Sequence, residues 1–356
     1  MNKYATARAL LFCCFSFSSW STNMHELQRA NWRPEVYEKL KTIIAEEAGR
    51  GKKIVLDLDW TIWNGDIEEE TSKKLISTGL LSMNGIPACF LLPFKLQENY
   101  ICPTKIKNLE EYRQNLKQAL HPSCFYAWAT QVLGGLSCQQ VIEAADQAYF
   151  AQPNIRAEMI DLIGMFLHEK YDVWIVSASP VQMVRWFALK AINPMLAHLG
   201  FDERLKPGNI IGINTLLQNA EQELFSDYEL VSTDLAYANL EAQALSSYML
   251  TNVISAPISA YEGKVAAIQQ HIKEPVYFGA GDSLSDKPFL ELCEHKLWFA
   301  TLSDSQTQKK LGAKKSWLIQ PILPTTPPRF LTNLEDIKKL DGVHEEVFLS
   351  LEYLGF

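Results

Sequence analysis

The alternation of apolar and polar positions predicts a helix that leads directly into a buried strand. Over residues 34–51 apolar side chains recur at helical spacing, with Pro34 suited to the first turn and a glycine at the end. One face of this helix gathers Val36, Leu40, Ile43 and Ile44. The following run KIVLDLD, residues 53–59, is apolar up to its aspartates, which is typical of a central parallel strand covered on both faces.

Two further runs repeat this pattern. YDVWIVSAS at 171–179 and EPVYFGAGDS at 274–283 are apolar, end in small or polar residues and precede a helical pattern. Repeated units of strand, polar loop and helix predict an α/β fold with a doubly wound, mainly parallel, Rossmann-like sheet. Ligands of such sheets bind at the carboxyl ends of the strands, so we expect the polar residues at these three ends to form one site.

A long interval without the strand pattern follows the first strand. Residues 67–154 contain helical patterns near 68–80, 109–120 and 137–149, which predict a mainly helical cap inserted into the sheet domain. A second interval, 177–264, includes β-rich pieces such as NIIGINTLL. The predicted organisation is a secretory leader at 1–22, a core at 30–66 and 155–320, the cap at 67–154, and a Pro-rich connector with a C-terminal helix at 321–356.

The leader is predicted from the first residues, where Lys3 and Arg8 precede a short apolar run and the small residues Ser19 and Ser21 suit a cleavage point. This pattern favours a periplasmic or secreted protein. The alternative is a disordered or partly buried N-terminal tail that is not a functional leader, which would leave the protein in the cytoplasm. No other segment reaches the roughly 18–20 uninterrupted apolar residues of a spanning helix, so no stable membrane span is expected.

Composition narrows the classes of partner. The 356 residues are 47% hydrophobic and carry a net charge of -8, with no Lys/Arg-rich run that could follow a phosphate backbone, so we expect no nucleic-acid partner. None of the seven cysteines forms a CxxC pair, so neither a zinc knuckle nor a dithiol redox motif is indicated. One or two disulfides within residues 89–138 and buried free thiols are the two alternatives.

The first strand ends in two carboxylates, Asp57 and Asp59, which would repel each other without a cation or a shared proton. Asp57 could attack an electrophile, and Asp59 could give a proton to the leaving group and later activate water. Ser177 would donate a hydrogen bond to a bound oxyanion, and Lys264 would neutralise the crowded negative charge. The third strand end supplies hard oxygen ligands of the kind Mg²⁺ prefers, namely Asp282 and Asp286.

Four short segments resemble motifs one to four of the haloacid dehalogenase-like superfamily, in the expected order: DLDWT (57–61), VWIVSAS (173–179), EGK (262–264) and GDSLSD (281–286). The resemblance implies a phosphoaspartyl mechanism, with Asp57 as nucleophile and Asp59 as general acid and base. It also implies a phosphate site made by Thr61, Ser177 and Lys264. The implied Mg²⁺ ligands are Asp57, Asp59, Asp282 and Asp286.

Finer features narrow the resemblance to the phosphatases. Dehalogenase members lack the second acid that Asp59 provides, and P-type ATPases carry lysine there. The large cap and the forms SASP and GDSxSD are similar to the phosphoserine phosphatase-like group. NW before the first helix, GDIEE after motif one and FYAWATQVLGG at 125–135 are similar to bacterial phosphorylcholine phosphatases. The implied function is Mg²⁺-dependent hydrolysis of a small phosphorylated amine or alcohol, such as phosphorylcholine.

The cap should choose the substrate, and a quaternary ammonium group favours aromatic faces with a nearby carboxylate. The candidates are Trp63, Glu68, Glu69, Tyr126 and Trp128. As the alternative, Tyr126 and Trp128 are ordinary interior aromatics of the cap, and the acidic run is a solvated first helical turn.

Position 60 departs from the superfamily, because tryptophan stands where glycine, asparagine or serine is usual. A bulky indole beside the nucleophile would restrict the phosphate pocket or pack under the loop. Two other functions therefore stay open. One is a catalytically weak binding or effector module on the same scaffold, and the other is a phosphotransferase to an acceptor other than water.

Overall fold

The computed structural model describes residues 26–29, 32–91, 94–96, 99–101, 106, 108–151, 155–300 and 316–321. The predicted leader and, apart from residue 321, the predicted connector and C-terminal helix lie outside these described residues.

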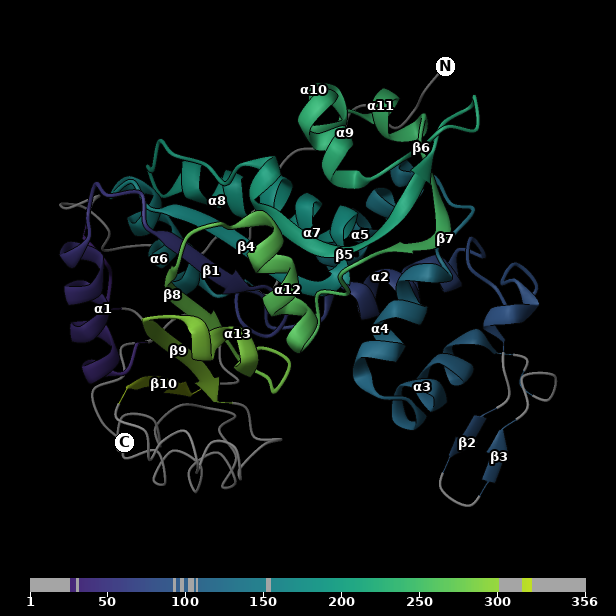
Figure 1. The fold of residues 1–356 in the computed structure, drawn as a ribbon, viewed down its shortest axis with the longest axis horizontal. Coiled ribbons are helices and arrows are strands. Elements are labelled where there is room, and N and C mark those ends of the chain that lie inside the picture. The colour runs from purple at the N-terminus through teal and green to yellow at the C-terminus, as the bar shows by residue number, and fades with distance from the viewer. Residues whose placement is uncertain are drawn as a thin grey trace.

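An eight-stranded sheet forms the centre of this part of the chain, in the order β10-β9-β8-β1-β4-β5-β6, with β7 also paired to β5 (Figure 1). Every pair from β10 to β5 is parallel, and β6 and β7 run antiparallel to β5. The predicted mainly parallel α/β sheet is therefore confirmed. The strands are β1 Lys53–Asp57, β4 Asp172–Pro180, β5 Ile210–Gln218, β6 Leu224–Phe225, β7 Met249–Ser255, β8 Val276–Gly281, β9 His295–Ala300 and β10 Trp317–Pro321.

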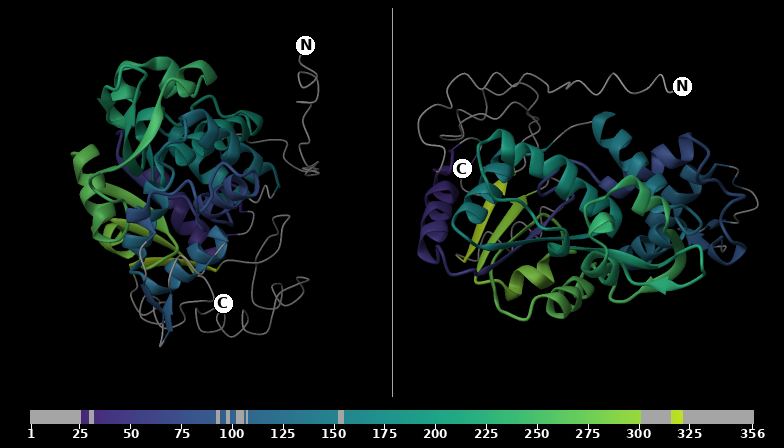
Figure 2. Two further views of the ribbon diagram at one scale, coloured as in Figure 1. Left: turned by 90° about the vertical axis from the view of Figure 1, so that its right-hand side faces the viewer. Right: turned by 90° about the horizontal axis from the view of Figure 1, so that it is seen from above.

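Alternate residues of the central strands face opposite sides of the sheet, and helices cover each side. Ile54 and Leu56 pack in one core, and Val55 packs in a second core. The helices of the first core include α1 Pro34–Glu46, α6 Ala157–His168 and α7 Val181–Trp186, and those of the second are α12 Glu262–His271 and α13 Lys287–Leu292. In the right-hand view of Figure 2, the light-green helices α12 and α13 lie across the strands from the teal helices. The sheet is thus doubly wound, which explains why residues 54–56 of its central strand β1 are all apolar.

The interval predicted to form the cap is mainly helical. The predicted helices near 68–80, 109–120 and 137–149 correspond to α2 Ile67–Ser77, α3 Leu109–Ala119 and α5 Cys138–Ala151, and the structure adds α4 Pro122–Gln131. A 3₁₀ turn, Ala88–Phe90, and the short antiparallel hairpin of β2 Phe94–Leu96 and β3 Asn99–Ile101 complete it. Figure 1 shows α3, α4 and this hairpin on the side of the molecule away from β9 and β10.

The second interval extends the sheet toward the cap. Strand β5 pairs in parallel with β4 at its start and antiparallel with β7 at its end. The free edge of β7 then meets the loop between α4 and α5, where the amide of Gly135 donates to Leu250 O (2.8 Å) and the amide of Leu250 donates to Leu136 O (2.8 Å). The other elements of this interval are the π-helical turn Phe187–Ile192, α8 Asn193–His198, the 3₁₀ turn Pro207–Asn209, α9 Asp227–Thr233, α10 Leu235–Ala238 and α11 Ala242–Ser246.

Four cysteines of the described residues are free thiols. Cys89 and Cys124 are exposed, whereas Cys138 and Cys293 are buried, and Cys102 lies outside the described residues. The alternative of buried free thiols thus holds for two of the four. Within the ranges given above, no helix combines the length and the apolar character needed to cross a membrane.

Candidate active site

The carboxyl ends of β1, β4 and β8 place polar side chains at one edge of the sheet. Asp57 ends β1 and pairs in register with Val176, the residue before Ser177. Strand β8 pairs with β1 on its other side and ends one residue before Asp282. All three polar side chains are buried. The strand register therefore brings together residues that are more than a hundred positions apart in the chain.

Asp57 is held by a lysine and a hydroxyl group. Nζ of Lys264 donates to Asp57 Oδ1 (2.6 Å) and also to Asp286 Oδ1. The Thr61 hydroxyl donates to Asp57 Oδ2 (2.9 Å). Burial alone would lower the pKa of Lys264, but the charges of Asp286 and Asp57 outweigh it and raise this pKa, so the ammonium stays charged.

Asp59 sits in a separate cradle of donors. Its Oδ1 accepts from the amide of Ile67 (2.7 Å), and its Oδ2 accepts from the hydroxyls of Ser177 (2.8 Å) and Ser179 (2.9 Å). Burial raises the pKa of Asp59, although these hydrogen bonds lower it in part. A carboxyl group with a raised pKa suits a general acid. Ser177, expected on the phosphate, has its hydroxyl on Asp59 in this structure.

Ser179 is a residue that the sequence reasoning missed. Its side chain is buried, and besides bonding Asp59 its amide donates to the Ser177 hydroxyl oxygen (2.9 Å). Two serines separated by one residue near the end of β4 were the available signal, because alternate residues of a strand share a face.

Three carboxylates could hold a metal ion. Oxygen atoms of Asp57, Asp282 and Asp286 lie within 4.8 Å of one another, and all three side chains are buried. Burial, and then the charges of Asp286 and Asp57, raise the pKa of Asp282 well above its ordinary value. Lys264 supplies one positive charge against three carboxylates, so a divalent cation with oxygen ligands, as Mg²⁺ prefers, fits the charge balance.

The Asp59 carboxylate, the fourth predicted metal ligand, is not in this group, because the amide and hydroxyl donors of its own cradle engage it. Asp286 is braced tightly from the other side. Its Oδ2 accepts from the amides of Asp282 (3.1 Å) and Ser283 (3.0 Å). Gly281 permits this approach, since a Cβ there would lie 2.6 Å from Asp286 Cβ.

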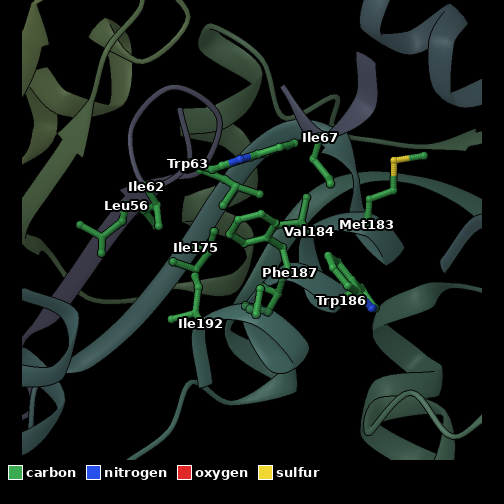
Figure 3. Close-up of a cluster of buried hydrophobic side chains, with 14 of the residues drawn as sticks. Leu56, Ile62, Trp63, Ile67, Ile175, Met183, Val184, Trp186, Phe187 and Ile192 are labelled. Atoms are coloured by element: carbon green, nitrogen blue, oxygen red, sulfur yellow. The ribbon is translucent and has the colours of Figure 1, made fainter. Parts of the chain in front are cut away.

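Trp63 and Trp128, two of the predicted substrate contacts, are interior residues. Trp63 is 1% exposed, and its ring centroid lies 5.3 Å from that of Phe187 in the cluster of Figure 3. Trp128 is 7% exposed, and its indole N–H donates to Phe90 O (2.9 Å). Both indoles are enclosed by neighbouring side chains and pack in the core, and their predicted contact with substrate stays a prediction.

The two predicted glutamates are already paired. Glu68 forms a buried ion pair with Arg113. Glu69 binds Lys117 (2.7 Å) and Lys73 (3.1 Å), and these lysines outweigh the effect of burial and lower the pKa of Glu69 to about 2. Arginine and lysine side chains therefore pair with both carboxylates in this structure, and the predicted contact of Glu68 and Glu69 with a substrate cation stays a prediction.

Asp66 and Tyr126 lie near Asp59, whose charge acts on both. Asp66 caps α2 by accepting from the amide of Glu69 (3.0 Å) through Oδ1. Burial and the charges of Asp59 and Glu68 raise the pKa of Asp66 to about 7. Burial, then Asp66 and Asp59, also raise the pKa of the Tyr126 hydroxyl. Tyr126 was among the substrate contacts predicted from the sequence, and Asp66 was not. The available signal for Asp66 was its place as an N-cap aspartate three residues before a glutamate.

The backbone conformation at Trp60 explains why glycine or asparagine is usual at this position in the superfamily. Its φ is 63°, in the left-handed region that glycine and asparagine adopt most easily. The indole is 45% exposed, so it does not pack under the nucleophile loop. The amide of Trp60 donates to Gly65 O (3.1 Å).

The doubly wound fold and the four motifs gathered at its strand ends agree with the resemblance of this chain to the haloacid dehalogenase-like superfamily. The chain is 24% identical over 277 residues to phosphorylcholine phosphatase of Pseudomonas aeruginosa, and the match covers 71% of this chain and 74% of that protein. No family model matches the chain.

Solved structures give a parallel comparison. A conserved protein of unknown function from Anaerococcus prevotii matches with a TM-score of 0.55 at 15% identity, covering 88% of this chain and 100% of that chain. A phosphoserine phosphatase bearing a phospho-aspartyl intermediate analogue matches with a TM-score of 0.39 at 15% identity, covering 81% of this chain and 97% of that chain.

Proposed function

We propose that this protein is an Mg²⁺-dependent phosphomonoester hydrolase that works through a phosphoaspartyl intermediate on Asp57. The observation that carries the proposal is the separation of two aspartates into different environments. Asp57 is paired with Lys264 and lies beside Asp282 and Asp286, which could hold a metal ion with it. Asp59 accepts hydrogen bonds from neutral donors, and its pKa is raised. This arrangement suits one carboxylate as nucleophile and the other as proton donor.

The proposed chemistry has two steps. A carboxylate oxygen of Asp57 forms a bond to phosphorus as the bond to the leaving oxygen breaks, and Asp59 gives its proton to that oxygen. Water then attacks the phosphorus while Asp59 takes its proton, which releases phosphate and restores Asp57. Lys264 and Thr61 keep Asp57 oriented through the contacts above. Mg²⁺ held by Asp57, Asp282 and Asp286 would offset the charge of the transferring phosphoryl group.

The proposed substrate is a small phosphorylated amine or alcohol, such as phosphorylcholine. The name of the Pseudomonas relative supports this choice. So does the setting of Asp59, since Asp66 and Tyr126 add a carboxylate and a hydroxyl beside it. Tyr261, whose amide donates to Ser285 Oγ (3.2 Å), brings a further ring, 5.2 Å from that of His121. Aromatic and acidic groups together favour a cationic leaving group.

We also propose that the protein is exported to the periplasm or secreted. This proposal rests on the leader pattern of residues 1–22. Comparing the cellular fraction and the N-terminal sequence of the expressed protein would test it, and a cytoplasmic protein with an intact N-terminus would overturn it.

Phosphate release tests the activity. The leaderless protein is assayed with phosphorylcholine, phosphoethanolamine, phosphoserine, glycerol phosphate and an aryl phosphate, with Mg²⁺ or with EDTA. We expect turnover that EDTA abolishes and that Asp57→Asn lowers by at least about a thousandfold, while Asp202→Asn, at an exposed aspartate, has no effect. Full activity in Asp57→Asn would refute the assignment of Asp57 as the nucleophile.

The same assay separates the two alternatives. A protein that binds phosphate analogues and turns over none of the five esters would favour a catalytically weak binding module. Phosphorylated alcohols formed in the presence of added acceptors would favour phosphotransfer, because a dry cap permits transfer to a bound hydroxyl.

A further inference from the structure

The loop that carries Asp59 and Thr61 is folded tightly. The amides of Ile62 and Trp63 both donate to Leu58 O, at 2.9 Å and 3.1 Å. Trp60 takes the left-handed conformation described above, which strains a bulky side chain. Such a conformation persists when neighbouring groups hold it, so the loop should have an external support.

Arg156 contacts this loop from the end of the cap insertion, directly before α6. Its amide donates to Ile62 O (2.9 Å). Its Nη2 donates to Asn64 Oδ1 (3.0 Å) and lies 3.5 Å from the carbonyl oxygen of Trp60. One residue thus contacts the loop at Trp60, Ile62 and Asn64.

The burial of Arg156 is costly by itself. The residue is 9% exposed, and its side-chain hydrogen bonds within the described residues go to a backbone carbonyl and a side-chain amide oxygen, both neutral. Its guanidinium lies over the ring of Phe299, 5.4 Å from the centroid, and its buried Nε has no hydrogen-bond partner among the described residues. Burial lowers the pKa of Arg156, and the more distant Glu158 and Asp282 offset this in part. Burying a cation among mainly neutral groups costs free energy. This cost suggests that Arg156 is needed to hold the loop in its conformation.

We propose that Arg156 is a positioning residue, which holds the Trp60 peptide in its left-handed conformation and so fixes Asp59 and Thr61 relative to Asp57. The catalytic consequence rests on the proposed phosphatase function, and the structural coupling does not. Glycine at position 60 would adopt the same conformation without strain, so it would need no such support. Arg156 and Trp60 should therefore be energetically coupled.

A double-mutant cycle tests this coupling. Arg156→Lys keeps the charge but loses the planar guanidinium that spans Trp60 O and Asn64 Oδ1. We expect it to lower kcat about tenfold and to change KM by less than about twofold, because the loop moves while the substrate contacts remain. Adding Trp60→Gly should restore most of the lost kcat.

Two matched variants make the cycle specific. Trp60→Ala removes the indole as glycine does but keeps the cost of a positive φ, so it should not rescue Arg156→Lys. Arg185→Lys changes another buried arginine, one that pairs with Asp227 away from the loop. It should lower the unfolding midpoint without any coupling to Trp60→Gly.

Unchanged kcat in Arg156→Lys, additive effects with Trp60→Gly, or equal rescue by Trp60→Ala would each overturn the proposal. The unfolding midpoints of the same variants provide a readout independent of activity. If the wild-type protein turns over no phosphomonoester, the proposed function fails, and non-additive midpoints for Arg156→Lys and Trp60→Gly still support the coupling. Additive midpoints would then refute it.

Discussion

Asp66, just after the loop that carries Asp59, is a carboxylate whose only hydrogen bond within the described residues is to a backbone amide, although the charge of Lys117 lowers its pKa in part. Glu68 and Glu69, its acidic neighbours in α2, are paired with Arg113 and Lys117. One Asp66 oxygen caps the helix, and the other makes no hydrogen bond within the described residues. A carboxylate near Asp59, the proposed proton donor, is well placed to attract a positively charged leaving group.

Asp66→Asn isolates this charge, because asparagine caps a helix about as well as aspartate does. At pH 8, above the pKa of Asp66 of about 7, we expect KM for phosphorylcholine to rise about tenfold, which corresponds to about 1.4 kcal/mol of lost interaction, with little change for glycerol phosphate, whose alcohol part carries no charge. Steady-state kinetics on both substrates measure the effect. Glu69→Gln is the control, since lysines already neutralise Glu69. An equal rise in KM for both substrates would contradict the hypothesis that the charge of Asp66 binds the cationic part of the substrate.

At this scale the sequence predicted residues whose place follows from a strand end and missed those whose place follows from packing. Asp57, Ser177 and Asp282 lie at one edge because parallel strands end together. Nothing local distinguishes a buried indole such as Trp63 from an accessible one, because burial depends on side chains from distant elements such as Phe187.

Helix α6 carries a buried acid that ties down the start of the described chain. Asp161 is 4% exposed, and its Oδ2 accepts from the amide of Gln28 (2.7 Å). Burial, opposed in part by this hydrogen bond, raises the pKa of Asp161 to about 7. Above the unfolded value near 3.8 the native state keeps a proton that the unfolded state has lost. Stability linked to Asp161 therefore falls as pH rises from about 4 to about 7.

Asp161→Asn removes this titration while an amide oxygen can still accept from Gln28. We expect the variant to be more stable than the wild type at pH 8, by about 1–2 kcal/mol, and the difference to vanish near pH 4. Denaturant unfolding at the two pH values measures it. Subtracting the wild-type curve removes the titration of Asp66, which both proteins share. A difference independent of pH would show that Asp161 is not the titrating group.

The elements themselves were predictable where the pattern was periodic. Helix α1 begins at Pro34 and buries the predicted apolar face, including Leu40 and Ile43. Helix α4 was missed, because its sequence is apolar on most sides and borders both the sheet extension and the cap. Strand β6 has two residues, too few for an alternation to appear.

At the scale of the whole molecule, the helical interval 67–154, predicted to be a cap, is joined to the sheet through β7. Besides the backbone bonds to β7, the side chains of Gln131 and Asn252 each donate to the other's backbone carbonyl, at 2.9 Å and 2.6 Å. Gly134 lets the two segments meet, since a Cβ there would lie 2.1 Å from Asn252 Nδ2. The sequence could not foretell this contact, because it joins two insertions that are separate in the chain.

Gly134→Ala should therefore weaken the contact between the α4–α5 loop and β7. We expect a loss of about 1–3 kcal/mol of stability and faster amide hydrogen exchange at Gly135 and Leu250, because the new methyl group displaces Asn252. Adding Asn252→Ala removes the clashing amide, so the double variant should lose less than the sum of the single losses. Gly208→Ala is the control, because a Cβ there meets nothing within 4 Å. Strictly additive losses of stability, or unchanged amide hydrogen exchange at Leu250, would mean that this contact does not hold the α4–α5 loop against β7.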